Sequence, residues 1–143
     1  MKTLQQILDS KKHKQVISIA YNRPVFDALV ILAEYKIGAL VVLDGEKLVG
    51  IFSERDYARE VILKGRSSKT TQINEVMTAK VLSGNPNDTV EHAMTTMSEK
   101  RIRHLPIVEN DKVVGMLSIG DLVKETIAYQ KDLIKQLESY IKS

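Results

Sequence analysis

The sequence contains the stretch GIFSERD at residues 50–56 and, 65 positions later, the stretch GMLSIGD at residues 115–121. Both stretches keep glycine, serine and aspartate at the same three places, with two apolar residues before the serine. The match extends without a gap towards the N-terminus, where the same offset relates further identical pairs. A fixed offset held over so many positions indicates an internal repeat. The identical pairs include Val16 and Val81, Asn22 and Asn87, Ala28 and Ala93, Leu40 and Leu105, and Val49 and Val114.

Each half of the chain is predicted to form a strand, a helix, two further strands and a second helix. Residues 16–19 are short and β-branched, which favours a strand. Proline is tolerated at the first position of a helix, so Pro24 suits the start of the helix that follows. Residues 25–33 place apolar side chains at three- and four-residue spacing, which is typical of a helix with one face in the core. Gly38 is expected to end this helix.

The middle of each half predicts a hairpin followed by a capped helix. The apolar runs 39–43 and 47–52 are separated by Asp-Gly-Glu, a strong hairpin signal, and the second half has Asn110-Asp111 at this place. Ser53 follows the hairpin and is predicted to cap a helix that begins at Glu54, and Ser118 copies it. Asp88 and Thr89 are the two candidate caps for the first helix of the second half.

A βαββα unit, present twice in tandem and ending each time in this glycine, serine and aspartate motif, resembles the CBS domain, named after cystathionine β-synthase. The pair resembles a Bateman module. The resemblance covers about Val16 to Val123 and implies an α/β (α+β) fold in which two repeats pack sheet to sheet around a pseudo-two-fold axis. The predicted organisation is an N-terminal segment at 1–15, a first repeat at 16–63, a connector at 64–78, a second repeat at 79–125 and a C-terminal helical extension at 126–143.

The resemblance implies ligands that contain adenosine, such as AMP, ADP, ATP, NAD or S-adenosylmethionine. It makes Asp56 and Asp121 ribose ligands. A carboxylate offers two acceptor oxygens, which match the paired 2′ and 3′ hydroxyls of ribose. The alternative is that both aspartates simply favour the positive end of the helix dipole. Their recurrence in both repeats favours binding.

Phosphate recognition is predicted near the same helix starts. Ser53 and Ser118 lie where backbone N–H groups are exposed, so capping and phosphate contact are both open to them. Arg55 is placed to donate charge-assisted hydrogen bonds to phosphate. Arg103 and His104 occupy a strand edge that the family often directs at the same group, although His104 also fits a surface or core histidine. The predicted slot for the base is lined by residues such as Val16, Ala39, Val81 and Pro106. Thr78 is a further predicted ligand-binding residue.

The two halves are not identical at the predicted ligand sites. Arg55 in the first half corresponds to Gly120 in the second, and Gly38-Ala39 corresponds to Arg103-His104. The two clefts are therefore predicted to bind ligands unequally.

Composition narrows the function. The 143 residues include no cysteine and carry a net charge of +3, with basic and acidic residues mostly interspersed. Three basic clusters stand out, and such runs are usually solvated surfaces. We find no Walker-type loop, no histidine pair at metal-ligand spacing and no nucleophile-base signature, so neither an enzyme, a metal site nor an obligatory cofactor is predicted. Signal-peptide and membrane-spanning patterns are lacking, and a cytoplasmic location is expected. The basic clusters are Lys11, Lys12, His13 and Lys14; Lys64, Arg66 and Lys69; and Lys100, Arg101, Arg103 and His104.

The last helix outgrows its counterpart and carries a broad apolar stripe from Leu122 to Ile141. This stripe packs either on Leu4, Ile7 and Leu8 of the same chain or on a second subunit, and a homodimer is predicted.

Together these features predict a regulatory module that binds AMP, ATP or NAD, senses energy or redox state and signals to an effector protein that the sequence does not identify. The alternative is a basic nucleic-acid-binding or protein-interaction module without a nucleotide ligand. Aromatic residues make up 5% of the chain, so a platform for stacking bases is not evident.

Overall fold

The computed structural model describes residues 2–11 and 15–142, which fall into two compact units. Unit 1 holds the described residues of 1–14, 83–108 and 115–143, and therefore joins the N-terminal segment to most of the second repeat. Unit 2 holds residues 15–82, which contain the first repeat, its connector and the first residues of the predicted second repeat, together with residues 109–114. The N-terminal segment thus belongs with the repeat that is more distant in sequence.

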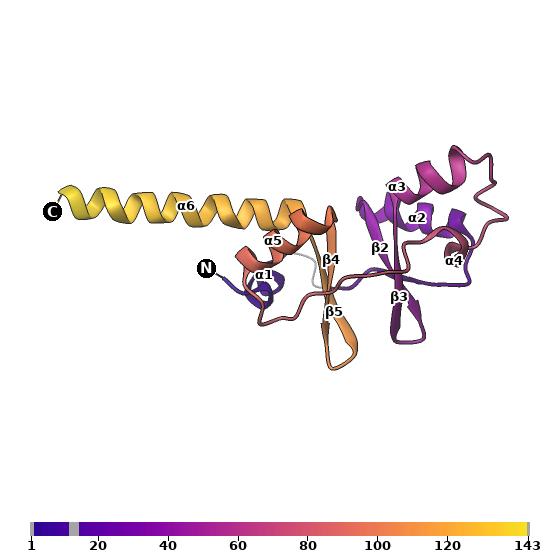
Figure 1. Cartoon of the computed structure of the whole chain (residues 1–143), viewed down its shortest axis with the longest axis horizontal. Helices are drawn as coiled ribbons and strands as arrows, with labels where there is room; N and C mark the ends of the chain where they lie inside the picture. The colour runs from indigo at the N-terminus through magenta and orange to yellow at the C-terminus, as the bar shows by residue number, and fades with distance from the viewer. Residues whose placement is uncertain (1, 12–14, 143) are drawn as a thin grey trace. The chain divides into compact units, whose positions relative to one another are not determined.

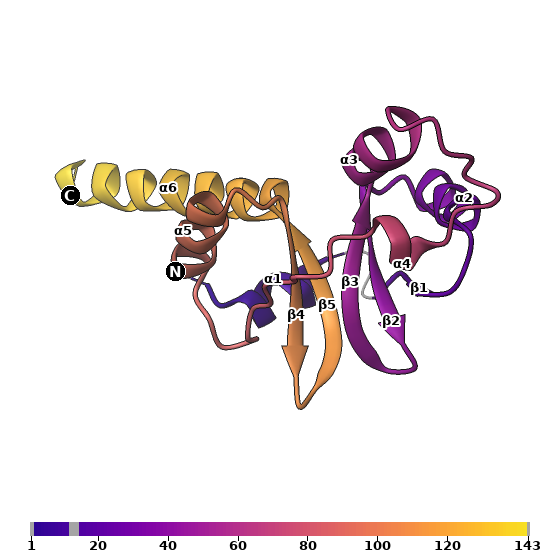
Figure 2. The same cartoon turned by 45° about the vertical axis from the view of Figure 1, so that its right-hand side comes forward.

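Unit 2 is built on a three-stranded sheet in the order β1-β2-β3, with β1 parallel to β2 and β2 antiparallel to β3 (Figures 1 and 2). Phe52, Leu40 and Val25 are fully buried in its core, together with Val61 and Ile73. The elements are β1 (Ser18–Ala20), α2 (Val25–Tyr35), β2 (Ala39–Asp44), β3 (Lys47–Ser53), α3 (Glu54–Asp56), the π-helical turn η1 (Tyr57–Ile62) and α4 (Ile73–Val76).

Unit 1 is built around the paired strands β4 and β5. Helix α5 and the first turns of α6 lie side by side near these strands (Figure 2). The core buries Ile107, Leu117 and Leu122 together with Val90 and Met97. The elements are α1 (Leu4–Ser10), α5 (Val90–Lys100), β4 (His104–Glu109), β5 (Lys112–Ser118) and α6 (Ile119–Lys142).

Helix α1 completes the core of unit 1. Thr3 caps this helix in a reciprocal box with Gln6, and Thr3 also forms an antiparallel bridge to Thr89. Leu4 and Ile7 are buried in the same cluster as Leu122 of α6. Of the two predicted partners for the apolar stripe of α6, the intramolecular one therefore covers the start of the helix.

The second repeat differs from the predicted pattern because it lacks a regular first strand. Only a parallel bridge between Gly84 and Ile107 stands where unit 2 has β1. Pro86 has no N–H, whereas Tyr21 at the matching position donates to Leu43 O at 3.1 Å. A Cβ on Gly84 would lie 3.0 Å from Leu4 Cδ1, so Leu4 occupies space beside the glycine.

The predicted end of the first helix was wrong. Helix α2 stops at Tyr35, and Lys36, not Gly38, takes the left-handed conformation, with φ of 55°. Arg101 does the same after α5, with φ of 54°. In both cases the backbone N–H of the left-handed residue donates to a carbonyl of the preceding turn, and this bond holds a non-glycine residue there.

Both predicted hairpins form. Gly45 has φ of 62°, and Asn110 and Asp111 have φ of 52° and 63°, so each turn places residues with positive φ between its strands. Of the two candidate caps for α5, the hydroxyl of Thr89 accepts the bond, from His92 N at 3.1 Å.

Candidate functional site

The motif of the first repeat folds into a reciprocal cap at the start of α3. Asp56 N donates to Ser53 Oγ at 3.2 Å, and Ser53 N donates back to Asp56 Oδ2 at 2.9 Å. Ser53 Oγ also lies within hydrogen-bonding distance of Asp56 Oδ2, at 3.1 Å. These bonds fix the Asp56 carboxylate beside the end of β3, so that it cannot turn freely towards solvent.

The connector holds the other oxygen of this carboxylate. Thr78 and Ile51 exchange backbone hydrogen bonds of 2.9 and 3.0 Å, and Thr78 Oγ1 donates to Asp56 Oδ1 at 3.1 Å. A Cβ on Gly50 would lie 2.5 Å from Met77 Sδ and 3.0 Å from Thr78 O. The glycine of the motif is therefore needed because the connector passes directly over β3.

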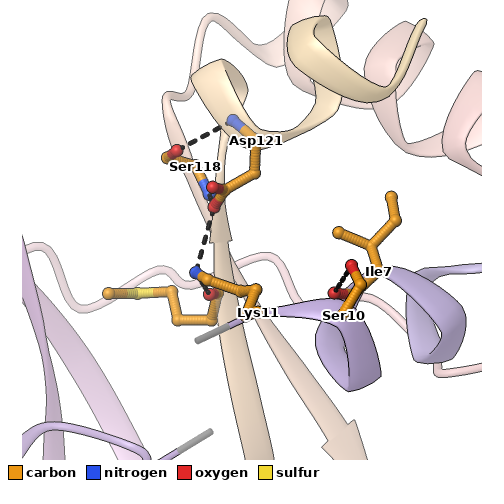
Figure 3. A network of polar contacts seen from close by, with 6 residues as sticks. Ile7, Ser10, Lys11, Ser118 and Asp121 are labelled. Atoms are coloured by element: carbon orange, nitrogen blue, oxygen red, sulfur yellow. Dashed lines mark hydrogen bonds and ion pairs between the residues drawn. The ribbon is translucent and has the colours of Figure 1, made fainter. Parts of the chain in front are cut away.

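The motif of the second repeat forms the same cap at the start of α6 (Figure 3). Asp121 N donates to Ser118 Oγ at 3.1 Å, and Ser118 N donates to Asp121 Oδ2 at 2.8 Å. The matching capping bonds explain why serine and aspartate recur three positions apart. Both aspartates therefore have a local role at the helix start, whether or not they also bind ribose.

A lysine takes the place of Thr78 in the second site. Lys11 Nζ lies 3.1 Å from Asp121 Oδ2 and donates to Met116 O at 3.3 Å (Figure 3). Leu8 lies over Gly115, where a Cβ would approach Leu8 Cδ2 to 2.5 Å. The end of α1 therefore crosses β5 much as the connector crosses β3. Lys12, His13 and Lys14 of the same basic cluster lie outside the described residues.

The ion pair between Lys11 and Asp121 keeps the carboxylate of the second site charged. Burial raises the pKa of the Asp121 carboxyl, but the hydrogen bond from the Ser118 backbone and the charge and hydrogen bond of Lys11 lower it by more, so the pKa lies below its usual value. The side chains of Lys11 and Asp121 are 32% and 29% exposed, so solvent still reaches the pair. Asp121 is therefore an anion whose charge is balanced from within unit 1.

The backbone at the start of each second strand also reaches the capped helix. Glu54 N donates to Gly38 O at 3.1 Å, and Ile119 N donates to Arg103 O at 2.8 Å. Arg103 is exposed, and His104 begins β4 half-buried. Arg55 is exposed on α3. Arg55 is thus one residue before Asp56, and Arg103 joins the start of α6 through its backbone; their contact with a ligand stays a prediction.

The residues predicted to line the base slot are divided between the units. Ala39 is buried and pairs with Ser53 in the β2–β3 register, and Val16 and Val81 of the same unit are half-buried. Pro106 is buried in unit 1, where its carbonyl accepts a bond from Gly84 N. The structure brings Ala39 to the Ser53 and Asp56 site, whereas a single slot shared by all four residues stays a prediction.

Two features bear on other kinds of site. Among residues 2–11 and 15–142, no three histidine, aspartate or glutamate side chains gather closely enough to hold a metal ion. Within that same part of the chain, no helix has the length and apolar character needed to cross a membrane.

The paired helix caps agree with a comparison of the whole sequence. The sequence model of the CBS domain matches residues 12–63 and 73–128, one match for each repeat. This chain belongs to the CBS-domain family. It is 38% identical over 122 residues to CBS domain-containing protein CBSX3, mitochondrial, of Arabidopsis thaliana. The aligned region covers 82% of this chain and 59% of the plant protein. The chain thus spans little more than half of this plant relative.

Solved CBS-domain structures support the fold of the pair. A CBS-domain protein of Burkholderia ambifaria is 46% identical, with a TM-score of 0.85 over 89% of this chain and 95% of the other. The CBS domain pair of protein MJ0100 is 26% identical, with a TM-score of 0.78 over 90% of this chain and 98% of the other. That pair was solved in complex with 5′-methylthioadenosine and S-adenosyl-L-methionine.

Lys11 is the site residue that sequence reasoning missed. Its basic cluster was recognisable, but the repeat offset of 65 residues matches Lys11 with Val76 and not with Thr78. The repeat therefore gave no reason to assign Lys11 the role of Thr78. The only available signal was the apolar pattern of Leu4, Ile7 and Leu8, which indicates that the N-terminal segment packs on a core without saying which one.

Proposed function

We propose that this CBS-domain protein is a regulatory module that binds adenine nucleotides at two sites, built on Asp56 and Asp121, and catalyses no reaction itself. The observation that carries the proposal is the repeated capping box, which presents one oriented carboxylate at each helix start. In this reading the bound nucleotide reports the energy or redox state of the cell to an effector protein.

The chemistry of ribose fits these carboxylates. A carboxylate has about four lone-pair positions, and two vicinal hydroxyls donate to it in a bidentate manner. Asp121 accepts two of these bonds, from Ser118 N and Lys11 Nζ, and keeps the other positions for ribose. Asp56 accepts three, two from Ser53 and one from Thr78 Oγ1, so bidentate ribose binding there displaces the Thr78 hydroxyl. The two adenosine compounds bound by the MJ0100 pair carry such a ribose, which supports the same ligand class here.

The cations around the sites suit a phosphate or pyrophosphate. Arg55 lies one residue before Asp56, and its guanidinium offers several donors in a fixed plane. In the second site the Lys11 ammonium pairs with Asp121, and the Arg103 backbone carbonyl accepts a bond from Ile119 N at the helix start, with His104 next to Arg103 in sequence. AMP, ATP and NAD are therefore the preferred candidates, because each carries phosphate for these cations to bind, whereas S-adenosylmethionine carries none.

Calorimetric titration with AMP, ATP, NAD and S-adenosylmethionine tests the proposal. At a hundredfold excess over Kd, a ligand that binds only the folded protein stabilises it by about 2.7 kcal/mol, which a thermal melt detects. Asp56→Asn and Asp121→Asn should each weaken one site roughly tenfold to a hundredfold. Asp44→Asn, at the exposed end of β2, is the matched control and should leave both sites unchanged.

Two other results would count against the proposal. If none of the four compounds moved the melting midpoint while a salt-dependent gel shift with duplex DNA appeared, the basic nucleic-acid-binding alternative would take its place. Chemical conversion of a nucleotide above the rate without protein would contradict the absence of catalysis. Mass spectrometry of nucleotides released from freshly purified protein would then identify the physiological ligand.

We also propose that the protein is a homodimer. The support is the apolar stripe of α6, of which the Leu122 end alone is buried within unit 1.

A further inference from the structure

The last four turns of α6 are exposed on all sides in the part of the chain that the structure describes. Leu122 is the one buried residue of this helix, and Glu125 and Thr126 are half-buried. Every described residue from Ile127 onwards is exposed, and Figure 1 shows the helix running on past α5. Most of the stability of a helix in a protein comes from packing of its apolar face, so a partner that covers these exposed turns would stabilise them.

The exposed turns carry the spacing of a coiled coil. Apolar residues alternate at four- and three-residue intervals, with one glutamine among them. This is the a and d pattern of a heptad repeat, which buries its seam against another helix of the same kind. Ile127 is 47% exposed, Leu137 55% and Ile141 80%, so the seam is open along its length. The seam consists of Val123, Ile127, Gln130, Ile134, Leu137 and Ile141.

The residues beside the seam decide its direction. In an antiparallel pair whose two-fold axis crosses the seam at the level of residue 132, Lys124 of each copy faces Glu138 of the other. Leu133, which is 44% exposed, faces its own copy on the opposite flank. This arrangement forms two contacts between opposite charges and one apolar contact. Its one unfavourable contact is between the two Lys131 side chains, which repel each other near the axis. Complementary flanking charges set orientation in coiled coils.

A parallel pair lacks these contacts. There Thr126 would flank Lys131, Leu133 would flank Glu138, and the two Gln130 side chains would meet in the seam. No opposite charges would face each other, and a carboxylate would lie against an apolar side chain.

We propose that a second copy of this chain covers α6 in an antiparallel helix pair centred on Asp132. This gives the homodimer proposed above a defined geometry, and it is independent of whether the protein binds a nucleotide. The size of the dimer and the titrations with nucleotides are separate measurements, so either proposal can fail alone.

Charge reversal on the full chain tests the direction. Lys124→Glu and Glu138→Lys each place like charges together twice, so each should raise the dimer dissociation constant about tenfold in sedimentation equilibrium. The double variant recreates both pairs and should restore wild-type association. Lys135→Glu lies on the solvent side of the pair, and it is the control that should change nothing.

Distances between spin labels give a second readout. The chain has no cysteine, so single cysteines introduced at Glu125, Asp132 or Ser139 label one place each. With a rise of about 1.5 Å per residue, antiparallel helices separate two labels at 139 by about 21 Å along the axis, but bring labels at 125 and 139 of different copies level. A parallel pair gives equal separations at 132 and 139. A monomeric mass at all concentrations, equal separations, or no restoration in the double variant would overturn the proposal.

Discussion

The ammonium of Lys11 lies 3.1 Å from Oδ2 of Asp121, at the place in the second repeat where Thr78 meets Asp56 in the first. One site therefore has a neutral hydroxyl beside its aspartate and the other a cation. The Thr78 hydroxyl adds no charge beside Asp56, whereas the Lys11 ammonium offsets the charge of Asp121 and can turn to a ligand anion. This difference arises from the N-terminal segment, which lies outside both repeats.

Replacement of Lys11 by methionine should change ligand preference at the second site. Without the ammonium, the Asp121 carboxylate repels a nearby phosphate, while its capacity to accept ribose hydroxyls increases. We expect the preference for AMP over adenosine to fall by roughly tenfold at this site, as measured by calorimetric titration of both ligands. Lys2→Met removes another cation of the N-terminal segment, one that pairs with Glu125 at 3.4 Å, and serves as the control. An equal loss for AMP and adenosine would show that Lys11 acts on folding alone.

The same ion pair makes stability depend on pH. The folded-state pKa of Asp121 is lowered, so its contribution to the free energy of unfolding is present above the unfolded pKa, near 3.9, and is lost as pH falls through the folded value. Because both side chains are about a third exposed, the contribution of the pair is under about 1 kcal/mol. Urea unfolding should show Lys11→Met less stable than wild type at pH 7 and equally stable near pH 2. A constant difference at both pH values would mean that packing of the lysine stem, not charge, is lost.

The parts of the fold that sequence predicted are those fixed by local interactions. The Asp44-Gly45 turn, the Thr89 cap and the serine and aspartate boxes each involve residues within a few positions of one another. Turn and capping preferences act at this range and are therefore legible in the sequence. Because the two halves repeat, each turn or cap predicted in one half also predicted the corresponding turn or cap in the other.

The parts that sequence did not predict depend on contacts between distant segments. Leu4 enters a core formed by residues more than eighty positions away, and nothing in a seven-residue helix specifies that destination. The space beside Gly84, which Leu4 occupies, follows from the same contact. Lys11 inherits its site role from this packing, since the helix that precedes it is what brings its ammonium to Asp121.

Replacement of the two motif glycines by alanine should lower the free energy of unfolding by different amounts. A Cβ on Gly50 would meet the Thr78 backbone carbonyl at 3.0 Å as well as the Met77 side chain, so Gly50→Ala must displace the connector. We expect a loss of about 1–3 kcal/mol in the free energy of unfolding. Gly115→Ala meets only the flexible Leu8 side chain and should cost less.

Gly120→Ala is the control for these glycine substitutions. Its nearest contact would be Ser118 Oγ at 3.5 Å, and a helical alanine there should be neutral or slightly stabilising. Denaturant unfolding of the three variants checks the order. If Gly115→Ala proved the most damaging of the three, rigid packing of α1 rather than of the connector would limit stability.

Exchange of Arg55 and its counterpart should transfer phosphate recognition between the sites. Arg55 follows Glu54 at the start of α3, and Gly120 holds the same position at the start of α6. Both positions are exposed, and a Cβ on Gly120 would have its nearest contact with Ser118 Oγ at 3.5 Å, so the first carbon of a side chain has room there. A hydrogen bond between charged groups typically contributes about 1.5–3 kcal/mol. Arg55→Gly should therefore weaken AMP at the first site by roughly tenfold to a hundredfold while leaving adenosine nearly unchanged, because the ribose contact through Asp56 remains. Gly120→Arg should strengthen the binding of AMP relative to adenosine at the second site.

Titration of AMP and adenosine into both variants measures the two effects. Arg55→Gly is combined with Asp121→Asn, and Gly120→Arg with Asp56→Asn, so that the other site is weakened in each case. Parallel losses of AMP and adenosine in Arg55→Gly, together with no gain in Gly120→Arg, would show that this position does not contact phosphate.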